Sequence, residues 1–355
     1  MDTRDTPEQA ELRRSARRLA RELGPATVAD LDDATRAKRL AVAVGDAGWF
    51  ELRNDVGDGA PLASGVEAAI VAEALGTAVA DVAFAGLVLG ADLARRAGAP
   101  PASSAPVAFA SSLTDPAVVY GPETAAPLFV VDVAREHEDV AYVLVPEGPG
   151  YRLAQVSADG ARDGPARAEQ GWGSDLTRSV RTIPAGAQLQ EVPDQRRVVT
   201  DDDLAAGTAL GLALTSADLV GVMRGVLDIT VAYAAERRQF GVPVGSFQAV
   251  QHRLADARCL MEGSLSVALH ASWAVDDLEP KEARAAGRVA KAYCARAART
   301  VCETAIQVHG GMGNTWECMV HVYLRRALLS SRWFGDDGEQ LRELERERLD
   351  DDGLS

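Results

Sequence analysis

The sequence of 355 residues lacks the paired cysteines of a disulfide or zinc framework. Its four cysteines, Cys259, Cys294, Cys302 and Cys318, all lie in the last third, and none forms a Cys-x-x-Cys pair. This spacing predicts buried, reduced thiols and no metal site. The sequence also has no His-Glu-x-x-His, Gly-x-Ser-x-Gly or P-loop motif. These absences argue against zinc hydrolases, serine hydrolases and nucleotide triphosphatases.

Positive charge is scarce as well. Lysine and arginine number 37 against 52 aspartates and glutamates, a formal net charge of -15. A surface of this sign argues against broad attraction to nucleic acid or to anionic membranes. Residues 1–24 lack the apolar core of a signal peptide, and no later run reaches about 18 apolar residues. We therefore expect a cytoplasmic protein that binds no nucleic acid and does not insert into a membrane.

The amino-acid pattern divides the chain into three successive segments. Residues 1–100 carry apolar side chains at helical spacing, which predicts an N-terminal helical domain. Residues 101–197 contain short β-favouring runs between Gly, Pro and Asp clusters, which predicts a middle β domain. Residues 198–355 return to long alanine-rich apolar segments, as in an antiparallel bundle. The expected fold class is mostly α with a central β domain.

Particular elements follow from the same patterns. The Pro- and Ser-rich stretch 99–106 is the expected boundary between the first two domains. Residues 338–355 predict a short charged helix that frays into an acidic tail. The expected strands lie in "LFVVDV" (128–133), "VAYVLVP" (140–146) and "SVRTIP" (179–184), and the expected bundle helices span 204–237, 247–276 and 280–309.

The first motif, "AERRQFGVPVGSFQ" at 235–248, interrupts two apolar helical runs. Gly241 and Pro243 break the first helix, and Ser246 is positioned to cap the second. One interpretation is structural: the arginines are solvated helix-end charges, and Phe240 is a hydrophobic plug. The other is that the Arg237 guanidinium, the freed backbone amides and the Gln248 amide bind a phosphate-bearing cofactor.

The second motif is "AIQVHGGMGNTWE" at 305–317. Its glycines follow a long helix rather than a strand and lack the spacing Gly-x-Gly-x-x-Gly, so they do not predict a dinucleotide-binding strand-turn-helix. Glycine here predicts a helix stop in the left-handed cap position. The same bare backbone would let a ligand approach closely. We expect His309 to be a packed side chain.

Together the two motifs resemble the C-terminal domain of the acyl-CoA dehydrogenase family, in spacing as well as residue type, from about 204 to 335. The order of segments agrees along nearly the whole chain: an N-terminal helical domain, a middle β-barrel or sandwich and a C-terminal four-helix bundle. The resemblance implies an FAD shared at a subunit interface. It makes Arg237 a contact to the pyrophosphate, with Gln239 and Phe240 beside it, Gln248 near the adenosine end, and Gln307, Gly310 and Gly311 contacts to an FAD held mainly by a neighbouring subunit.

The sequence departs from the family where the catalytic base belongs. The family reaction needs a carboxylate beside the flavin to remove the α proton of an acyl thioester. One family position for this base aligns with Phe334, and the other aligns close to Gly211. The family also has two wall segments in the β domain. The first is retained at most as Leu113, Thr114, Asp115 and Pro116, and the second has no counterpart.

The pattern of retained and lost residues resembles the smaller, base-less subunits of actinobacterial heteromeric acyl-CoA dehydrogenases. That resemblance implies a second, catalytic subunit, a bulky or steroid-like acyl-CoA thioester as substrate and an electron-transfer flavoprotein as acceptor. Two alternatives stay open. The chain could form a self-sufficient homo-oligomer with an unconventional base, Asp336 or Glu317, or it could be a structural relative that binds neither FAD nor acyl-CoA.

Overall fold

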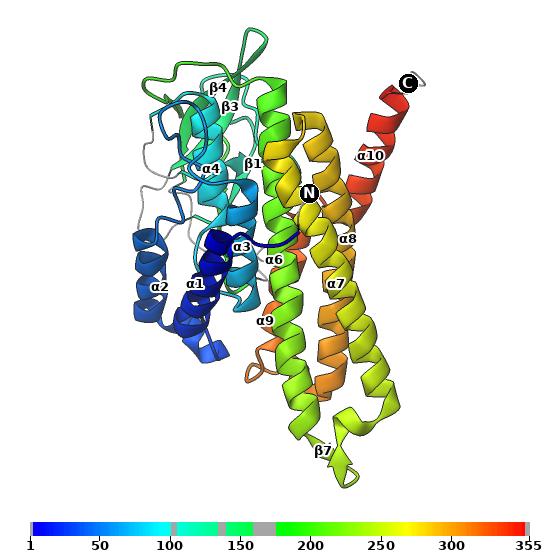
Figure 1. Cartoon of the computed structure of the whole chain (residues 1–355). Coiled ribbons are helices and arrows are strands. Elements are labelled where there is room, and N and C mark those ends of the chain that lie inside the picture. Colours follow the sequence, from blue (N-terminus) through cyan, green and yellow to red (C-terminus); the bar gives the residue numbers. More distant parts are fainter. Residues whose placement is uncertain (1–2, 101–104, 134–139, 159–174, 352–355) are drawn as a thin grey trace.

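The structure, a computed structural model, describes residues 3–100, 105–133, 140–158 and 175–351 (Figure 1). Its first part consists of helices, as expected. The Thr6 hydroxyl oxygen accepts a hydrogen bond from the Gln9 N–H at 3.2 Å, and the Gln9 side-chain oxygen accepts one from the Thr6 N–H at 3.0 Å. This pair is a capping box, and it starts the first helix. The elements of this part are α1 (Pro7–Leu23), η1 (Val28–Asp32), α2 (Ala34–Asp46), α3 (Gly65–Thr77) and α4 (Ala85–Arg96).

The middle part contains two antiparallel three-stranded sheets, in the orders β1-β2-β5 and β3-β4-β6. Parallel bridges from Val107 to Tyr142 and from Val118 to Leu144 connect them. The three expected strands are confirmed as β2, β3 and β5, while three further strands were missed. The bounds are β1 (Ala108–Phe109), β2 (Leu128–Val131), β3 (Val140–Glu147), β4 (Gly150–Ser157), β5 (Val180–Ile183) and β6 (Leu189–Glu191).

The last part is the bundle, in which the three expected long helices are confirmed to within three residues at each end. A hairpin and the 3-10 turn η3 connect the first two of them, and a second 3-10 turn, η4, follows the third. The expected charged helix is also present, whereas its acidic end at 352–355 lies outside the described residues. The elements are α6 (Asp201–Glu236), β7 (Arg238–Gln239), β8 (Val242–Pro243), η3 (Val244–Ser246), α7 (Gln248–Asp277), α8 (Pro280–His309), η4 (Gly310–Asn314), α9 (Val320–Arg332) and α10 (Asp337–Asp351).

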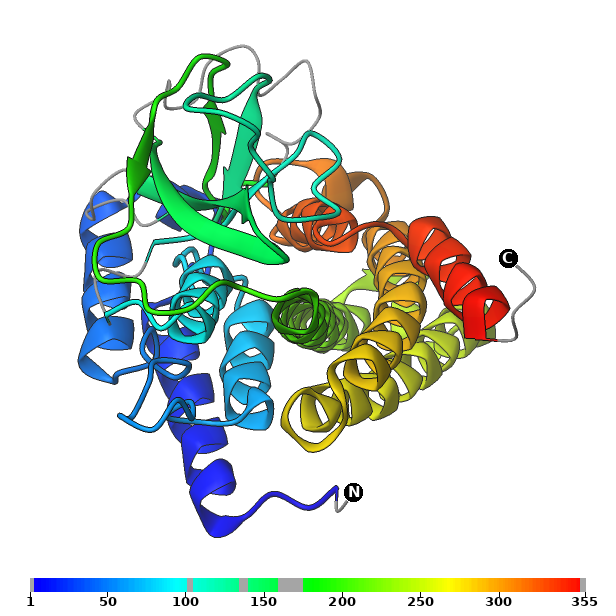
Figure 2. The same cartoon turned by 90° about the horizontal axis from the view of Figure 1, so that it is seen from above.

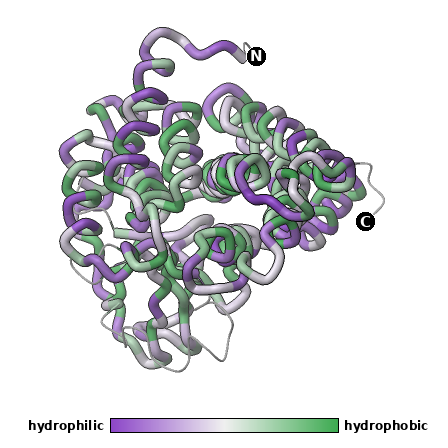
Figure 3. Tube along the Cα trace, turned by 90° about the horizontal axis from the view of Figure 1, so that it is seen from below, coloured by the Kyte–Doolittle hydropathy of each residue, from purple (hydrophilic) through white to green (hydrophobic). Residues whose placement is uncertain are grey.

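Helix α6 is the centre of the molecule. Seen from above, the N-terminal helices and the sheets lie to one side of α6, and α7, α8 and α10 lie to the other (Figure 2). By length and composition α6 could cross a membrane, but its most apolar window is 94% buried inside the protein. Hydrophilic segments lie mainly on the outer turns, for example along the N-terminal helices (Figure 3). Hence α6 is a core helix on which the other parts pack.

Two local predictions are wrong. Ser246 does not cap α7: Phe247 occupies the cap position, and the Ser246 hydroxyl donates instead to the Pro243 carbonyl at 2.7 Å within η3. Cys259 is exposed, because it lies on a solvent-facing side of α7, and Cys318 is only half-buried, although Cys294 and Cys302 are buried as expected. The domain boundaries remain predictions, and part of the 99–106 stretch lies outside the described residues.

Candidate functional site

The first motif forms the far end of the bundle. Helix α6 stops at Glu236, Arg237 caps it with extended backbone, and the two strands β7 and β8 pair around Phe240 and Gly241. Both turn residues have positive φ, 52° and 83°. A two-residue loop with this geometry matches the right-handed twist of a hairpin. The helix break therefore gives rise to a hairpin that projects from the end of the bundle, at the lower tip of Figure 1.

The projecting hairpin exposes an aromatic side chain. Phe240 is 95% exposed, and its ring meets the ring of Phe247 edge-on at 6.4 Å. The interpretation of Phe240 as a hydrophobic plug is therefore wrong, because the hairpin carries the ring away from the bundle core. Arg237, Gln239 and Gln248 are exposed at the same end. An exposed set of this kind is available to a ligand or a partner surface.

The second motif ends α8 at the same end of the bundle. His309 is buried, stacks on Tyr233 of α6 at a centroid distance of 4.2 Å, and its Nδ1 lies 2.9 Å from the Ala305 carbonyl. Burial lowers the pKa of His309, so the ring is a packed neutral imidazole, as expected. The Tyr233 carbonyl accepts the Arg237 N–H at 2.8 Å. This stack therefore joins the two motifs.

This end of the bundle, which we call the tip surface (Arg237, Gln239, Phe240, Gln248, Gln307, Gly310, Gly311), suits the anionic part of a dinucleotide. Gly310 ends α8 with a φ of 63°, and nothing lies within 4 Å of the space that a β carbon would take at Gly310 or Gly311. The Gly310 N–H itself donates to the Ile306 and Gln307 carbonyls, so the two glycines offer close approach, and the Arg237 guanidinium is the suitable phosphate ligand. The first turn of α7 carries no acidic residue, so its positive dipole end is not neutralised.

Gly211 and Phe334, the positions with which the sequence aligned the family base, lie against each other in the N-terminal half of α6. A β carbon built on Gly211 would lie 2.1 Å from Cζ of Phe334, so the phenyl ring rests directly on the Gly211 backbone. Phe109 of β1 meets this ring edge-on at 5.1 Å, and Trp333 lies 5.8 Å from it. Three aromatic rings therefore cluster at the Gly211 backbone.

Hydrogen bonds fix the corner that carries these rings. The Phe334 N–H donates to the Leu113 carbonyl at 2.8 Å, and the Gln340 amide donates to the Phe334 carbonyl at 2.5 Å. Lys291 donates from Nζ to the Trp333 carbonyl at 2.7 Å and also to the Ser330 carbonyl. The corner is therefore held by the loop after β1, by α8 and by α10 together.

A buried charge network surrounds this corner. The Asp218 carboxylate accepts from Arg178 at 3.0 Å and from Arg326 at 2.7 Å, and all three side chains are at most 3% exposed. Burial opposes ionisation of Asp218, but the two guanidinium groups hold its pKa down, at about 2. The Arg178 guanidinium lies 5.3 Å from the Trp333 ring centroid. These ion pairs join α6, which carries Asp218, and α9, which carries Arg326, to Arg178 just before β5.

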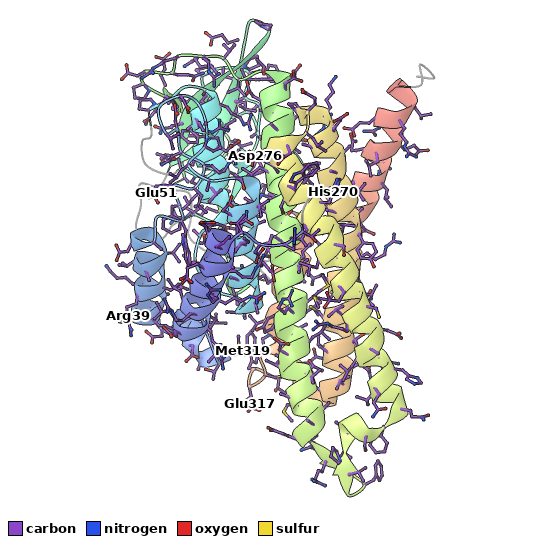
Figure 4. The ribbon with its side chains drawn as sticks, in the orientation of Figure 1. Arg39, Glu51, His270, Asp276, Glu317 and Met319 are labelled. Atoms are coloured by element: carbon purple, nitrogen blue, oxygen red, sulfur yellow. The ribbon has the colours of Figure 1, made fainter. Side chains whose placement is uncertain are left out.

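Neither unconventional base proposed from the sequence lies in a catalytic setting. Asp336 accepts the Glu339 N–H at 2.9 Å, and its own N–H donates to Glu339, a reciprocal cap at the start of α10. Glu317 is exposed on the loop that leads into α9, beside the lower half of α6 (Figure 4). Both residues therefore have ordinary structural or solvated positions. Among the described residues no group of His, Cys, Asp or Glu could hold a metal ion.

Comparison with known proteins agrees with this architecture. The family model "Acyl-CoA dehydrogenase, C-terminal domain" matches residues 209–349. The acyl-CoA dehydrogenase IpdE2 of Mycobacterium tuberculosis is 31% identical over 96% of this chain and 98% of its own length. The IpdE2 of Mycolicibacterium smegmatis is 36% identical over a matched stretch that covers 49% of this chain and 50% of that relative. The ChsE4-ChsE5 complex from Mycobacterium tuberculosis has the same fold, with a TM-score of 0.72 and 22% identity over 98% of this chain and 99% of that one.

The chain thus belongs to the acyl-CoA dehydrogenase family and has the family fold. The tip surface fits the phosphate-bearing part of FAD, whereas the Phe334 corner leaves no room beside Gly211 for a reacting thioester. Sequence reasoning missed the positioning roles of Lys291 and Gln340. The signal for Lys291 was a lone lysine within an apolar helical stripe.

Proposed function

We propose that this chain is the base-less subunit of a heteromeric, FAD-dependent acyl-CoA dehydrogenase. In this assembly the tip surface contributes Arg237, Gln248 and Gln307 to an FAD whose reactive ring is enclosed by a different chain. That other chain supplies the carboxylate base. The observation that carries the proposal is the contrast between the open tip surface and the ring of Phe334 on Gly211.

When bound, FAD accepts the hydride that leaves the β carbon of an acyl thioester. The residues of this chain act at the far end of the cofactor. The Arg237 guanidinium neutralises phosphate charge, the Gln248 and Gln307 amides orient the dinucleotide, and the bare backbone at Gly310 and Gly311 lets it approach closely. A chain with this set completes a cofactor site across an interface, where only one of two unlike subunits must carry the base.

Two positions in the structure weaken the self-sufficient alternative. Asp336 is engaged in capping α10, and Glu317 is exposed on a loop. Phe334 cannot accept a proton. The structural alternative is weakened by the exposure of the polar set Arg237, Gln248 and Gln307 at one end of the bundle, since a purely structural bundle has no need of it.

We further propose a bulky acyl-CoA thioester of lipid or steroid catabolism as the substrate, an electron-transfer flavoprotein as the acceptor and the cytoplasm as the location. Support for the substrate comes from family membership and from the similarity to the two IpdE2 proteins. Support for the second subunit comes from the similarity to the ChsE4-ChsE5 complex, which has two named components.

The test compares flavin content and turnover with and without a partner. The chain is purified alone and after co-expression with a neighbouring acyl-CoA dehydrogenase homologue that carries the base. We expect a colourless lone chain, and about one FAD per pair of unlike chains in the complex. Arg237→Ala in this chain should weaken FAD binding to the complex by roughly 10- to 100-fold, the effect of one lost charge-assisted contact of about 1.5–3 kcal/mol.

The matched control is Arg299→Ala, which removes an exposed arginine of α8 that pairs with Glu303 at 2.9 Å, outside the tip surface. This variant should leave FAD binding unchanged. A lone chain that holds stoichiometric FAD and oxidises an acyl-CoA would overturn the proposal, as would an Arg237→Ala complex that binds FAD like the unaltered one.

A further inference from the structure

The Trp333–Phe334 corner has a backbone conformation that is unfavourable for its residue. Phe334 has a φ of 67°, in the left-handed region that residues with a β carbon rarely adopt. The contacts with Leu113 and Gln340 hold both of its backbone polar groups. Leu113 itself has a φ of 58°. Two non-glycine residues in this region bonded to each other show that the surroundings impose the position of the phenyl ring.

The ring fills a space between α6 and β1 that has the character of a ligand pocket. Gly211 supplies bare backbone on one side, and Phe109 supplies an aromatic edge on the other. Phe334 is 3% exposed, so water has no access to most of the ring. A side chain other than hydrogen at position 211 would displace it. The fit of ring to glycine therefore leaves no free volume at this point.

Immediately beyond the ring lies an apolar cavity of about 30 Å³. Helix α4 contributes Leu89 and Leu93 to its wall, and α6 contributes Leu204, Gly207 and Thr208. None of its described lining residues is acidic or basic, and Phe334 forms part of its wall. The space at Gly207 is open, with nothing within 4 Å of the place that a β carbon would take. The cavity is thus the unfilled remainder of a larger apolar crevice that the phenyl ring divides.

We propose that Phe334 is an internal occupant of this chain's own acyl pocket, and that the chain keeps a latent site for a flat, apolar six-membered ring at this position. The phenyl ring takes the volume and the contacts that a ligand would otherwise have. This inference rests on the proposed function in treating the crevice as a former acyl pocket.

Physical precedent for the latent site is the behaviour of cavities made by truncating buried apolar side chains. Such cavities stay dry when lined by Leu, Ile and Phe, and they bind benzene. Phe334→Ala removes one phenyl ring from a wall of that composition and connects the space to the existing cavity. Benzene replaces the removed group almost atom for atom, so it is the probe.

The experiment measures the melting temperature of the full chain with and without saturating benzene. We expect benzene to raise the melting temperature of Phe334→Ala by about 2 °C or more, through binding to the folded state. The unaltered chain should not respond. Phe334→Leu, which keeps an apolar side chain at this position, serves if the alanine variant fails to fold, and should show a smaller response of the same sign.

Phe84→Ala is the matched control, because Phe84 is also 3% exposed but does not line the existing cavity, so its truncation adds no neighbouring volume and should give a smaller benzene response. An equal response of Phe84→Ala, or no response of either position 334 variant, would overturn the proposal. Neither flavin nor partner takes part in this measurement. Failure of the heteromeric assembly would therefore remove the proposed function and leave a positive benzene result standing.

Discussion

At the scale of single residues, position 291 shows how burial changes chemistry. Lys291 is fully buried, and its Nζ donates to the carbonyls of Ser330 and Trp333. Burial lowers the pKa of this amine to about 7, an effect that nearby Arg178 strengthens and Asp218 opposes. A neutral amine still has two N–H donors, one for each carbonyl. The lysine can therefore hold the Trp333–Phe334 corner without a buried positive charge.

The pKa of Lys291 predicts a pH-dependent stability. The folded-state pKa of about 7 lies below the usual lysine value of 10.5, so the unfolded chain binds more protons between these limits, and stability rises with pH there. Chemical denaturation at pH 7 and pH 9 should show the unaltered chain gaining about 2 kcal/mol relative to Lys291→Met. Lys281→Met, at an exposed position of α8, should show no such pH-dependent difference. Equal pH dependence of all three would contradict the prediction.

The sequence identified a phenylalanine at position 334 but not the contacts that its ring makes. Alignment to a family motif identifies a residue type, and phenylalanine already excludes proton transfer. The contact of Phe334 with Gly211 joins two segments that are far apart in the chain, and it depends on a left-handed backbone at Phe334. Local sequence patterns carry no signal for a left-handed phenylalanine, because that conformation is disfavoured in isolation.

At the scale of elements, glycines let α3 and α6 approach each other closely. A β carbon on Gly221 of α6 would lie 2.1 Å from the Glu73 carbonyl oxygen of α3, and one on Gly76 would lie 2.5 Å from the Asp218 carbonyl oxygen. The pattern of apolar residues predicted both helices, yet glycine within a helix is in itself only unfavourable to helix formation. The role of these glycines becomes visible once the two helices are placed against each other.

Substitution at two glycines of α6 separates packing from helix propensity. Gly221→Ala should destabilise the chain by about 1–3 kcal/mol, because overpacking exceeds the gain in helix propensity. Gly207→Ala has open space around its β carbon and should stabilise by about 0.5–1 kcal/mol. Thermal or chemical denaturation measures both. The prediction fails if the two variants shift stability in the same direction.

At the scale of the whole molecule, one buried arginine ties the N-terminal helices to the bundle. Arg53 is 0% exposed and bonds to Asp92 at 3.0 Å and to Asp276 of α7 at 2.9 Å. Asp276 also accepts the Gly65 N–H at 2.6 Å, where α3 begins, near the upper end of α7 (Figure 4). Composition predicted the α, β, α order of segments, whereas such ties between segments depend on tertiary placement.

Removal of this tie should loosen the molecule as a unit. Asp276→Ala leaves the buried Arg53 with one fewer counter-charge and frees the Gly65 N–H, so we expect a loss of about 2–4 kcal/mol in unfolding free energy. Hydrogen exchange should accelerate in the first turn of α3 and the last turn of α7. Asp277→Ala, at the exposed neighbouring position, should alter stability by less than about 0.5 kcal/mol. Equal effects of both substitutions would refute this role of Asp276.

The length of α6 has a consequence for how such a chain can diverge. Gly211 is the eleventh residue of α6 and Arg237 is its C-cap, so the two positions are about 39 Å apart at 1.5 Å per residue. At this separation a substitution at one position leaves the contacts at the other unchanged. The Phe334 corner and the tip surface can therefore change independently of each other.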